Sequence, residues 1–367
     1  MVNKVNFYDF QKLHDADLKE KIMKRFQDIV NSNAYVEGEC NDLFEKKFAA
    51  HLGAKHCLLV ANGTDALQLS LQALDIKPKD KVGVPGITFH ASASSVYQMG
   101  GEPVFIDIDP KTGLICMDSF IRIHEKHQLK AVMPVHIYGL PAPIEELNKY
   151  CHKNNIKIIE DAAQAYGTKY KSGGLVGSSS NIATFSFYPT KNLGAFGDAG
   201  AICFSDDNLK QKLISLRNHG RSPDGISLIG HNSRCDHLQA AVLLEKLDYV
   251  KNWDQKRKEV ARFYFDHLKD LPLQMVPEDY HQLSGWHLFP ILVEKRNELR
   301  KYLADNNIGA NLFYEFSVPE LPAFSHFTGE REESLKFAAN SLCLPMHPHL
   351  SPDDLQHVAA TLKSYFK

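Results

Sequence analysis

Short apolar runs alternate along the chain with longer segments in which apolar residues recur every three or four positions. Seven of the runs have the length and composition of strands that are buried on both faces of a sheet. They cover residues 57–61, 81–84, 102–106, 131–135, 156–160, 182–187 and 200–204. The segments between them include 64–74 and 144–154, which have the apolar spacing of helices packed on a sheet. The pattern predicts a doubly wound α/β fold of three layers, α/β/α, around a seven-stranded, mostly parallel sheet.

A second region follows this alternation. A long helical pattern runs from Cys235 to about Asp270, and one face of it carries Leu238, Ala241, Leu244 and Leu247. The chain has 367 residues, more than a typical single domain, so a division into two domains is expected. We therefore predict a large domain over residues 1–248 and a smaller C-terminal α/β domain over residues 249–367. In the smaller domain we expect a strand region at 286–293 and helices at 296–305 and 352–365.

The composition narrows the classes of function. Hydrophobic residues make up 44% of the chain and charged residues 23%, as in an ordinary globular protein. The formal net charge of −2 gives no long-range attraction to nucleic acid, and no segment approaches the ~18 apolar residues that span a bilayer. We therefore expect neither a nucleic-acid nor a membrane partner. The seven cysteines form no C-x-x-C pair, which favours reduced thiols, mostly in the core, and a cytoplasmic protein.

Two polar residues lie where predicted strands end. Asp161 follows the apolar run at 156–160, and Lys191 lies just beyond the run at 182–187. A lysine amine can form a Schiff base with an aldehyde cofactor. A carboxylate that faces a pyridinium nitrogen keeps that ring protonated, so that the ring withdraws electrons. Together the two residues predict the two-point attachment of pyridoxal 5'-phosphate (PLP), with Lys191 as the catalytic residue.

Further residues near predicted strand ends would complete such a site. Gly63 and Thr64 open a predicted helix, whose free N–H groups could hold a phosphate. Phe89 could stack on a planar ring, Ser186 could reach the phosphate or the Schiff base, and Gln164 could donate to a ring oxygen. Taken singly, these residues also fit a capped helix, a core aromatic and a strand serine bonded to backbone. The chain lacks a Walker-type loop and a dinucleotide fingerprint, which disfavours nucleoside triphosphate hydrolysis.

In combination, these motifs resemble those of the DegT-type (StrS-like) sugar aminotransferases, which are PLP enzymes of the aspartate aminotransferase fold type I. The matching segments are GTDAL at 63–67, TF at 88–89, VHIYG at 135–139, EDAAQA at 160–165, SFYPTK at 186–191, NHG at 218–220 and GHNSR at 230–234. Their order agrees with the family from residue 35 to residue 348. The resemblance implies a PLP-transferase large domain and transamination of a nucleotide-linked 3-keto or 4-keto sugar, with L-glutamate as the amino donor.

The resemblance also implies a role for each matching residue. Lys191 would form the internal aldimine and shuttle a proton, Asp161 would pair with the pyridine nitrogen, and Gln164 would contact the ring oxygen. Phe89 would stack on the ring. The phosphate would be held by Gly63, Thr64, Ser186 and, from the neighbouring subunit, Asn232, so that a homodimer with shared active sites is expected. The candidates for substrate contacts are Tyr188, Arg221, Tyr314 and His347.

Two positions depart from the family pattern. Phe313 stands where many relatives carry a histidine that contacts the sugar or nucleotide, and this leaves the substrate open. Cys235 replaces an aliphatic residue, which it can do as a small hydrophobe. No metal site is expected, because His347 and His349 lack nearby Cys or acidic partners. The Trp286-His287 pair is interpreted as core.

Two alternative functions remain after this comparison. PLP-dependent sugar dehydratases resemble this chain but replace the Schiff-base lysine with histidine, so the presence of Lys191 favours transamination. A non-catalytic PLP-binding regulatory protein would keep the same cofactor residues, and the sequence alone does not exclude it.

Overall fold

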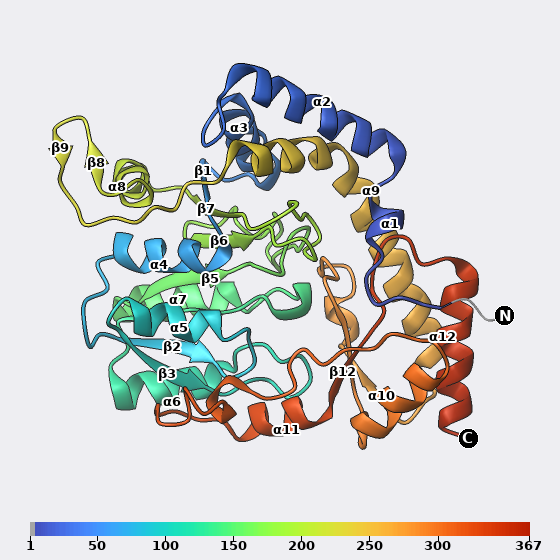
Figure 1. The fold of residues 1–367 in the computed structure, drawn as a ribbon. Coiled ribbons are helices and arrows are strands. Elements are labelled where there is room, and N and C mark those ends of the chain that lie inside the picture. Colours follow the sequence, from blue (N-terminus) through green and yellow to red (C-terminus); the bar gives the residue numbers. More distant parts are fainter. Residues whose placement is uncertain (1–3) are drawn as a thin grey trace.

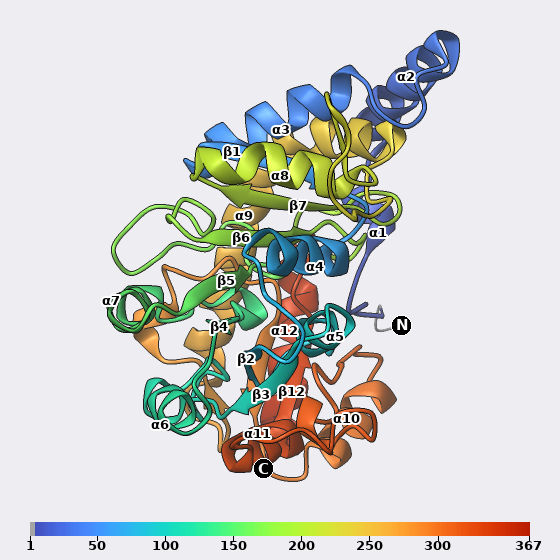
Figure 2. The ribbon, with the colours of Figure 1, turned by 90° about the vertical axis from the view of Figure 1, so that its left-hand side faces the viewer.

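The computed structural model describes residues 4–367 and has a seven-stranded sheet at its centre. The strand order is β1-β7-β6-β5-β4-β2-β3; the labels follow it from top to bottom in Figure 2, and Figure 1 shows the same sheet from the side. The strands are β1 (His56–Val60), β2 (Lys81–Pro85), β3 (Glu102–Ile106), β4 (Ala131–Val132), β5 (Lys157–Asp161), β6 (Ile182–Ser186) and β7 (Gly200–Phe204). The seven strands predicted from apolar runs are confirmed.

One strand of this sheet runs against the others. β3, β2, β4, β5 and β6 pair in parallel, whereas β7 is antiparallel to both of its neighbours, β6 and β1. The connection from β6 to β7 contains no helix, which is possible because an antiparallel neighbour needs no crossover. This helix-free connection carries Lys191, so the reversal of β7 keeps the lysine close to the sheet edge.

The strand predicted at 131–135 is shorter in the structure, because β4 ends after two residues. Pro134 has no N–H to donate to a sheet ladder. The chain nevertheless stays between its neighbours, since Met133 N donates to Gly83 O at 2.8 Å and Asp161 N donates to Pro134 O at 2.9 Å. The prediction was therefore right about the position of this segment and wrong about its length.

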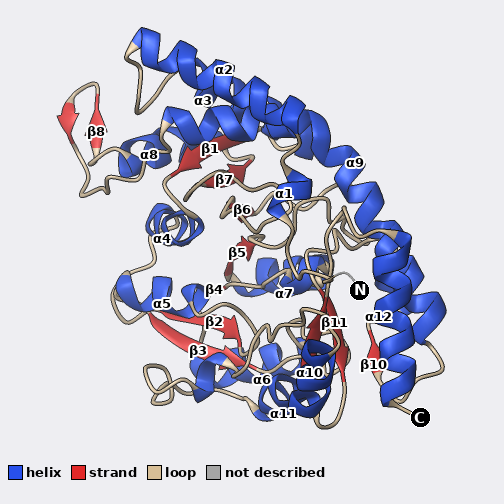
Figure 3. Ribbon diagram, turned by 45° about the vertical axis from the view of Figure 1, so that its right-hand side comes forward, coloured by secondary structure: helices blue, strands red, loops and turns tan. Residues whose placement is uncertain are grey.

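Helices cover both faces of the sheet (Figure 3). One face is covered by α4 (Gly63–Ala73), α5 (Ala91–Gln98) and α8 (Asp207–Arg217). The other face is covered by α3 (Glu39–Leu52), α6 (Met117–His127), α7 (Ile144–Asn154) and part of α9 (His237–Leu268). Residues of β1 alternate between the two layers, with Leu58 facing α4 and α8 and Leu59 facing α3. The predicted three-layer α/β/α arrangement is confirmed.

Beyond α9 the chain forms a second sheet, which is antiparallel. Its strands are β10 (Gln274–Met275), β11 (Phe289–Leu292) and β12 (Ser341–Leu344). The helices around it are α10 (Arg296–Asp305), α11 (Glu332–Asn340) and α12 (Pro352–Tyr365). The helices predicted at 296–305 and 352–365 are confirmed, whereas only Phe289–Leu292 of the predicted strand region is a strand. Because α9 is continuous through residue 248, the domain boundary there stays a prediction.

The remaining elements are short or lie near the N-terminus. α1 (Phe10–Leu13) is followed by α2 (Ala16–Ser32), which packs along α9. The strands β8 (Arg221–Ser222) and β9 (Gly225–Ile226) form a hairpin that projects from the body at the upper left of Figure 1. Three 3-10 helices are η1 (Ile137–Gly139), η2 (Glu278–Tyr280) and η3 (Val318–Glu320). Within residues 4–367, no helix has the length and apolar character needed to cross a membrane.

The first described residues pack against the C-terminal part of the chain. Val5 N donates to Asn307 O at 2.9 Å, and Gly309 N donates to Val5 O at 2.9 Å. The Phe7 ring stacks on Phe313 with 5.8 Å between centroids. The N-terminal segment is therefore fixed against the C-terminal part, and it carries Tyr8 to the site described next.

Candidate active site

A cavity of about 830 Å³ lies where β1, β2, β5 and β6 end. Because these strands are mutually parallel, their carboxyl ends meet at one edge of the sheet, where α/β folds commonly bind ligands. The structure brings together in this cavity most of the predicted site residues, namely Gly63, Thr64, Phe89, Asp161, Gln164, Ser186, Tyr188, Lys191 and Tyr314. Residues from the C-terminal part, including Phe313, close one side of the cavity.

Asp161 is the last residue of β5, and its carboxylate is held from two directions. Its Oδ2 accepts a hydrogen bond from Ser92 Oγ at 2.7 Å, and its Oδ1 accepts one from Ala163 N at 3.1 Å. The side chain is buried but lines the cavity. It can therefore present a fixed anionic group to a bound ligand.

Lys191 lies in the connection between β6 and β7. Its backbone N donates to Tyr188 O at 2.8 Å, which fixes the turn. Burial lowers the pKa of the Lys191 amine to about 8, although the negative charge of Asp161 opposes this change. A substantial fraction of the amine is therefore neutral near physiological pH, as a nucleophile or proton carrier must be.

An anion cradle lies at the start of α4. Asn62 caps the helix, with its Oδ1 accepting from Asp65 N at 2.8 Å. The first N–H groups of a helix have no partner inside it and carry the positive end of its dipole. A Cβ on Gly63 would lie 2.8 Å from Ser186 Cβ, and a Cβ on Gly200 would lie 2.5 Å from Asn62 O. The glycines therefore allow the Ser186 hydroxyl and the helix N-terminus to approach each other closely, as a phosphate site requires.

An aromatic wall and one amide complete the cavity. The Phe89 side chain is 49% exposed, and its ring centroid lies 6.1 Å from that of Tyr314. Gln164 accepts from Tyr138 N at 2.7 Å and donates through Nε2 to the Tyr314 hydroxyl at 3.0 Å. These two bonds fix which end of the Gln164 amide faces the cavity. The exposed face of Phe89 is available for stacking on a planar ring.

Several residues at the cavity have no signal in the sequence pattern. Tyr8 reaches it from the N-terminal segment, and His287 reaches it from just before β11. His287 was interpreted as core; it is buried, with Nδ1 3.2 Å from Asn192 Oδ1, but it also lines the cavity. Burial lowers the pKa of His287, and the charges of Lys191 and Arg257 lower it further, so the ring is neutral. Ser92, whose hydroxyl donates to Asp161, also has no such signal in the sequence.

Three predicted residues lie outside the cavity of their own chain. Arg221 is exposed in the β8–β9 hairpin, and Asn232 is exposed beyond it, with Oδ1 accepting from the Arg234 guanidinium at 3.1 Å. His347 is buried, with Nε2 3.2 Å from Asn6 O, and it lines a much smaller cavity behind Lys191. Burial lowers the pKa of His347 to about 4. The predicted substrate contacts of Arg221 and His347 therefore need a partner subunit or a rearrangement.

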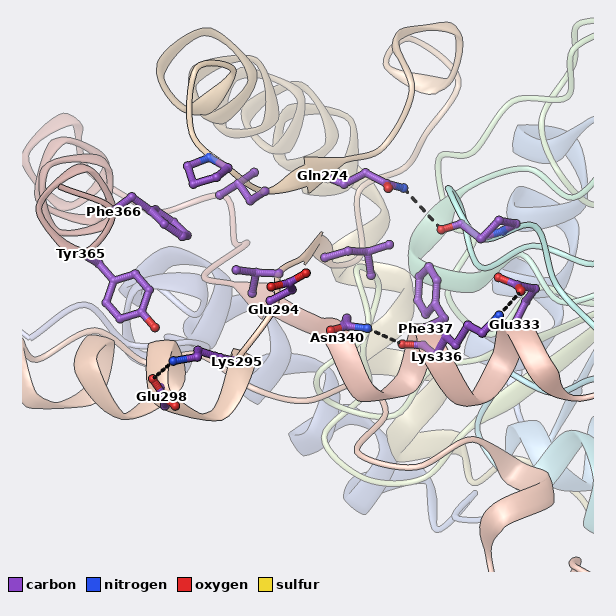
Figure 4. A pocket seen from close by; sticks show the side chains of 15 residues that line it. Gln274, Glu294, Lys295, Glu298, Glu333, Lys336, Phe337, Asn340, Tyr365 and Phe366 are labelled. Carbon is purple, nitrogen blue, oxygen red and sulfur yellow. Dashed lines mark hydrogen bonds and ion pairs between the residues drawn. The ribbon is translucent and has the colours of Figure 1, made fainter.

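A second large cavity, of about 910 Å³, lies between the small sheet, α11 and α12 (Figure 4). Four of its charged groups form two ion pairs, Lys295 with Glu298 at 3.6 Å and Lys336 with Glu333 at 2.8 Å. Both lysine side chains are exposed, so neither offers a buried amine like that of Lys191. Across residues 4–367, no group of three or more His, Cys, Asp or Glu residues is arranged to hold a metal ion.

Comparison with known proteins agrees with this geometry. The model of the DegT/DnrJ/EryC1/StrS aminotransferase family matches residues 16–363. The chain belongs to this aminotransferase family. The match spans the central sheet, the C-terminal sheet and every lining residue of the cavity except Tyr8.

Two curated relatives are similar over almost their whole length. The dTDP-3-amino-3,6-dideoxy-alpha-D-galactopyranose transaminase of Aneurinibacillus thermoaerophilus is 38% identical over 367 residues, covering 98% of this chain and 99% of the relative. The erythromycin biosynthesis sensory transduction protein EryC1 of Saccharopolyspora erythraea is 36% identical over 366 residues, covering 98% and 99%. One member of the family thus bears a transaminase name and another a regulatory name.

The fold is also shared with a solved family member. The crystal structure of S. venezuelae DesV in complex with a ketimine intermediate superposes with a TM-score of 0.94 at 33% identity, covering 99% of each chain. The predicted PLP aminotransferase fold is confirmed.

Proposed function

We propose that this family member is a PLP-dependent aminotransferase that acts on a nucleotide-linked keto-deoxysugar and takes the amino group from L-glutamate. The observation that carries the proposal is the placement of the Lys191 amine and the Asp161 carboxylate in one cavity at the sheet edge. The aminotransferase family of the chain and its sugar transaminase relatives support the same reaction class.

The residues around the cavity fit PLP. Gly63, Thr64 and Ser186 would hold the phosphate, because a side chain at Gly63 would fill the space beside Ser186. Asp161 would face the ring nitrogen, and Gln164 would face the ring oxygen with an amide that two hydrogen bonds already orient. When bound, PLP supplies an electron sink and carries the amino group between the two substrates.

The protein's own groups supply the proton transfers. Lys191 lines the cavity, and its lowered pKa lets one amine both accept and return a proton close to neutral pH. The Asp161 carboxylate stays at a fixed orientation because Ser92 and the backbone of Ala163 both donate to it. His287 is neutral and adds no competing positive charge beside Lys191.

The cavity of one chain is short of cationic groups for these substrates. Among its described lining residues, Lys191 is the only lysine or arginine. Glutamate carries two carboxylates and a nucleotide sugar carries two phosphates, and such anions are usually bound by arginine or lysine. Further positive charge therefore has to come from outside this lining.

We propose that a second copy of the chain supplies that charge and completes the phosphate site. Asn232 and Arg221 are exposed on or beside a projecting hairpin, in line with a role in a neighbouring cavity. The same hairpin region exposes two large apolar side chains, with Ile226 75% and Ile229 90% exposed. We therefore expect a homodimer with shared active sites, in which the partner covers these two side chains.

The cavity also bears on the alternatives. A dehydratase of this scaffold would lack the lysine that occupies position 191. A non-catalytic PLP-binding protein would keep the same lysine, so the half-reaction described next separates it from an aminotransferase. Lys191 together with the aminotransferase family and the transaminase relatives supports transamination. We also place the protein in the cytoplasm, a proposal supported by its seven unpaired thiols, of which only Cys116 is not fully buried.

The test is a half-reaction. Purified protein saturated with PLP is mixed with L-glutamate, and the absorption band of the cofactor is followed until it converts to the pyridoxamine form. Conversion by the wild type, with none by Lys191→Ala, supports the proposal. An intact PLP band after prolonged exposure to glutamate and to other amino donors would overturn it. The converted enzyme is then offered dTDP-, UDP- and GDP-linked keto sugars, and recovery of the PLP band identifies the acceptor.

A further inference from the structure

Three side chains form a continuous line of hydrogen bonds from the cavity wall to Asp161. Thr88 Oγ1 lies 2.7 Å from Ser92 Oγ, and Ser92 Oγ lies 2.7 Å from Asp161 Oδ2. Thr88 follows β2, and Ser92 lies in the first turn of α5. All three groups are buried, and Ser92 is fully inaccessible.

Proton counting fixes the direction of this line. The Ser92 hydroxyl has one proton and three oxygens within reach, those of Thr88, Phe89 O at 3.2 Å and Asp161. The ionised carboxylate is the strongest acceptor among them and one of the two nearest, so Ser92 donates to Asp161. Its oxygen can then accept the proton of Thr88. The line therefore runs from Thr88 through Ser92 to Asp161.

Ser92, at the end of this line of hydrogen bonds, donates to Oδ2 of Asp161, the carboxylate oxygen that receives no hydrogen bond from the backbone. Ala163 N holds Oδ1, so without Ser92 the carboxylate could turn about that single bond. Each donor in the line also polarises the next, which strengthens the final bond to the carboxylate. Ser92 does not line the cavity, so it can influence a bound ligand only through its neighbours.

We propose that Ser92 is a positioning residue: with Thr88 behind it, it holds the Asp161 carboxylate in the orientation needed to keep the ring nitrogen of the cofactor protonated. This inference rests on the proposed function. Under this proposal, helix α5 also controls, through Ser92, how strongly the cofactor ring withdraws electrons. Loss of the Ser92 donor leaves a carboxylate that only Ala163 N holds, so it is free to turn and stabilises a protonated ring nitrogen less.

The test compares Ser92→Ala with Ser95→Ala. Ser95 lies in the same helix, is equally buried, and its hydroxyl bonds only to the backbone carbonyl of Ser92 at 3.1 Å. Each variant is loaded with PLP that is 15N-labelled at the ring nitrogen, and the chemical shift of that nitrogen is measured. We expect S92A to move the resonance toward the unprotonated value, Thr88→Val to move it less, and S95A to leave it in place. The rate of the glutamate half-reaction should fall roughly tenfold or more in S92A, the effect of losing one hydrogen bond to a charged group.

The outcomes separate this inference from the proposed function. If wild type converts its cofactor with glutamate but S92A and S95A share one chemical shift and one rate, the positioning role is wrong while the proposed function stands. If wild type does not convert its cofactor at all, both fail. Should S92A not fold, Ser92→Cys keeps the volume with a weaker donor and carries the same expectation, and Ser92→Thr, which restores a hydroxyl, should recover the wild-type shift.

Discussion

The side-chain amide of Gln164 donates to the hydroxyl of Tyr314 at 3.0 Å and so joins residues 150 positions apart in the chain. Gln164 follows β5 of the central sheet, whereas Tyr314 belongs to the C-terminal part. The bond connects the two sides of the cavity. It leaves the second N–H of the Gln164 amide free to face a ligand. The site is therefore built jointly by the two sheets.

Removal of this bond should weaken cofactor binding without abolishing it. Tyr314→Phe keeps the ring beside Phe89 but leaves the Gln164 amide held only by Tyr138 N. The loss of one neutral hydrogen bond corresponds to about 1 kcal/mol, or roughly fivefold in the PLP dissociation constant. Equilibrium dialysis of the cofactor measures it, with Tyr97→Phe as the matched control, because Tyr97 is exposed and does not line the cavity. An unchanged constant in Y314F would show that the bond does not orient Gln164.

Lys191→Ala should abolish covalent attachment of the cofactor. Borohydride reduction of PLP-loaded wild type should tag the peptide that contains residue 191, whereas K191A should carry no tag. The glutamate half-reaction should fall by ~10² to 10⁴-fold or more, because the positioned base is gone as well. Lys251→Ala, which changes an exposed lysine on α9, should match the wild type in both measurements. A tag on another lysine of the wild-type protein would contradict the assignment.

The lowered pKa of Lys191 should appear as a pH dependence of cofactor capture. Only the neutral amine attacks an aldehyde, and the neutral fraction increases as pH rises through about 8. The rate at which the apoprotein captures PLP should therefore rise from pH 6.5 and level off above about 8, whereas an exposed lysine would keep rising toward its ordinary value near 10.4. Stopped-flow absorbance measures this rate. A midpoint near 10 would show that burial does not lower the pKa in solution.

Much of this arrangement could be predicted from the sequence, for a physical reason. Parallel strands buried on both faces are continuous apolar runs, and ligands gather where they end, so Asp161, Ser186 and Lys191 could be located from the pattern alone. The shortening of β4 follows from Pro134, which is visible in the sequence. Tyr8 and His287 could not be found in this way, because their places depend on contacts between residues far apart in the chain, such as His287 with Asn192, 95 positions away. The spacing of apolar residues along helices and strands contains no information about contacts between such distant residues.

A shared active site should be detectable in mixed dimers. Lys191→Ala subunits and Asn232→Asp subunits are each expected to be inactive, the second because a new negative charge would repel the phosphate across the interface. A heterodimer would contain one cavity with both wild-type residues and should recover part of the activity. Subunits with different affinity tags allow the heterodimer to be purified before assay. No activity in confirmed heterodimers of folded subunits would argue against sharing through Asn232.

Glu160, beside Asp161 on β5, should contribute to stability in a pH-dependent manner. Burial opposes its ionisation, yet hydrogen bonds from His136, Ser179 and Asn181 hold its pKa below the ordinary value. Because the pKa is depressed on folding, the stabilisation is present above the unfolded pKa of about 4.3 and is lost as pH falls through the folded value.

Glu160→Gln should therefore lower the free energy of unfolding by roughly 3 kcal/mol at pH 7, since an amide N–H would face groups that donate. The difference from wild type should shrink at pH 3.5. Urea denaturation at the two pH values measures it, and Glu259→Gln on the exposed face of α9 is the control. An equal loss of unfolding free energy at both pH values would mean that the changed shape of the side chain, and not the ionisation of Glu160, determines the loss of stability.

The 32-residue length of α9 has a consequence for how such enzymes can diverge. The helix spans about 48 Å, and each added or deleted residue would turn everything beyond it by about 100° and shift it by 1.5 Å. A single insertion in its middle would swing Tyr314 and His287 away from Lys191 in one step. Homologues that use the same pocket should thus vary in their loops while α9 keeps its number of residues. The length of this helix sets the distance between the central sheet and the C-terminal part.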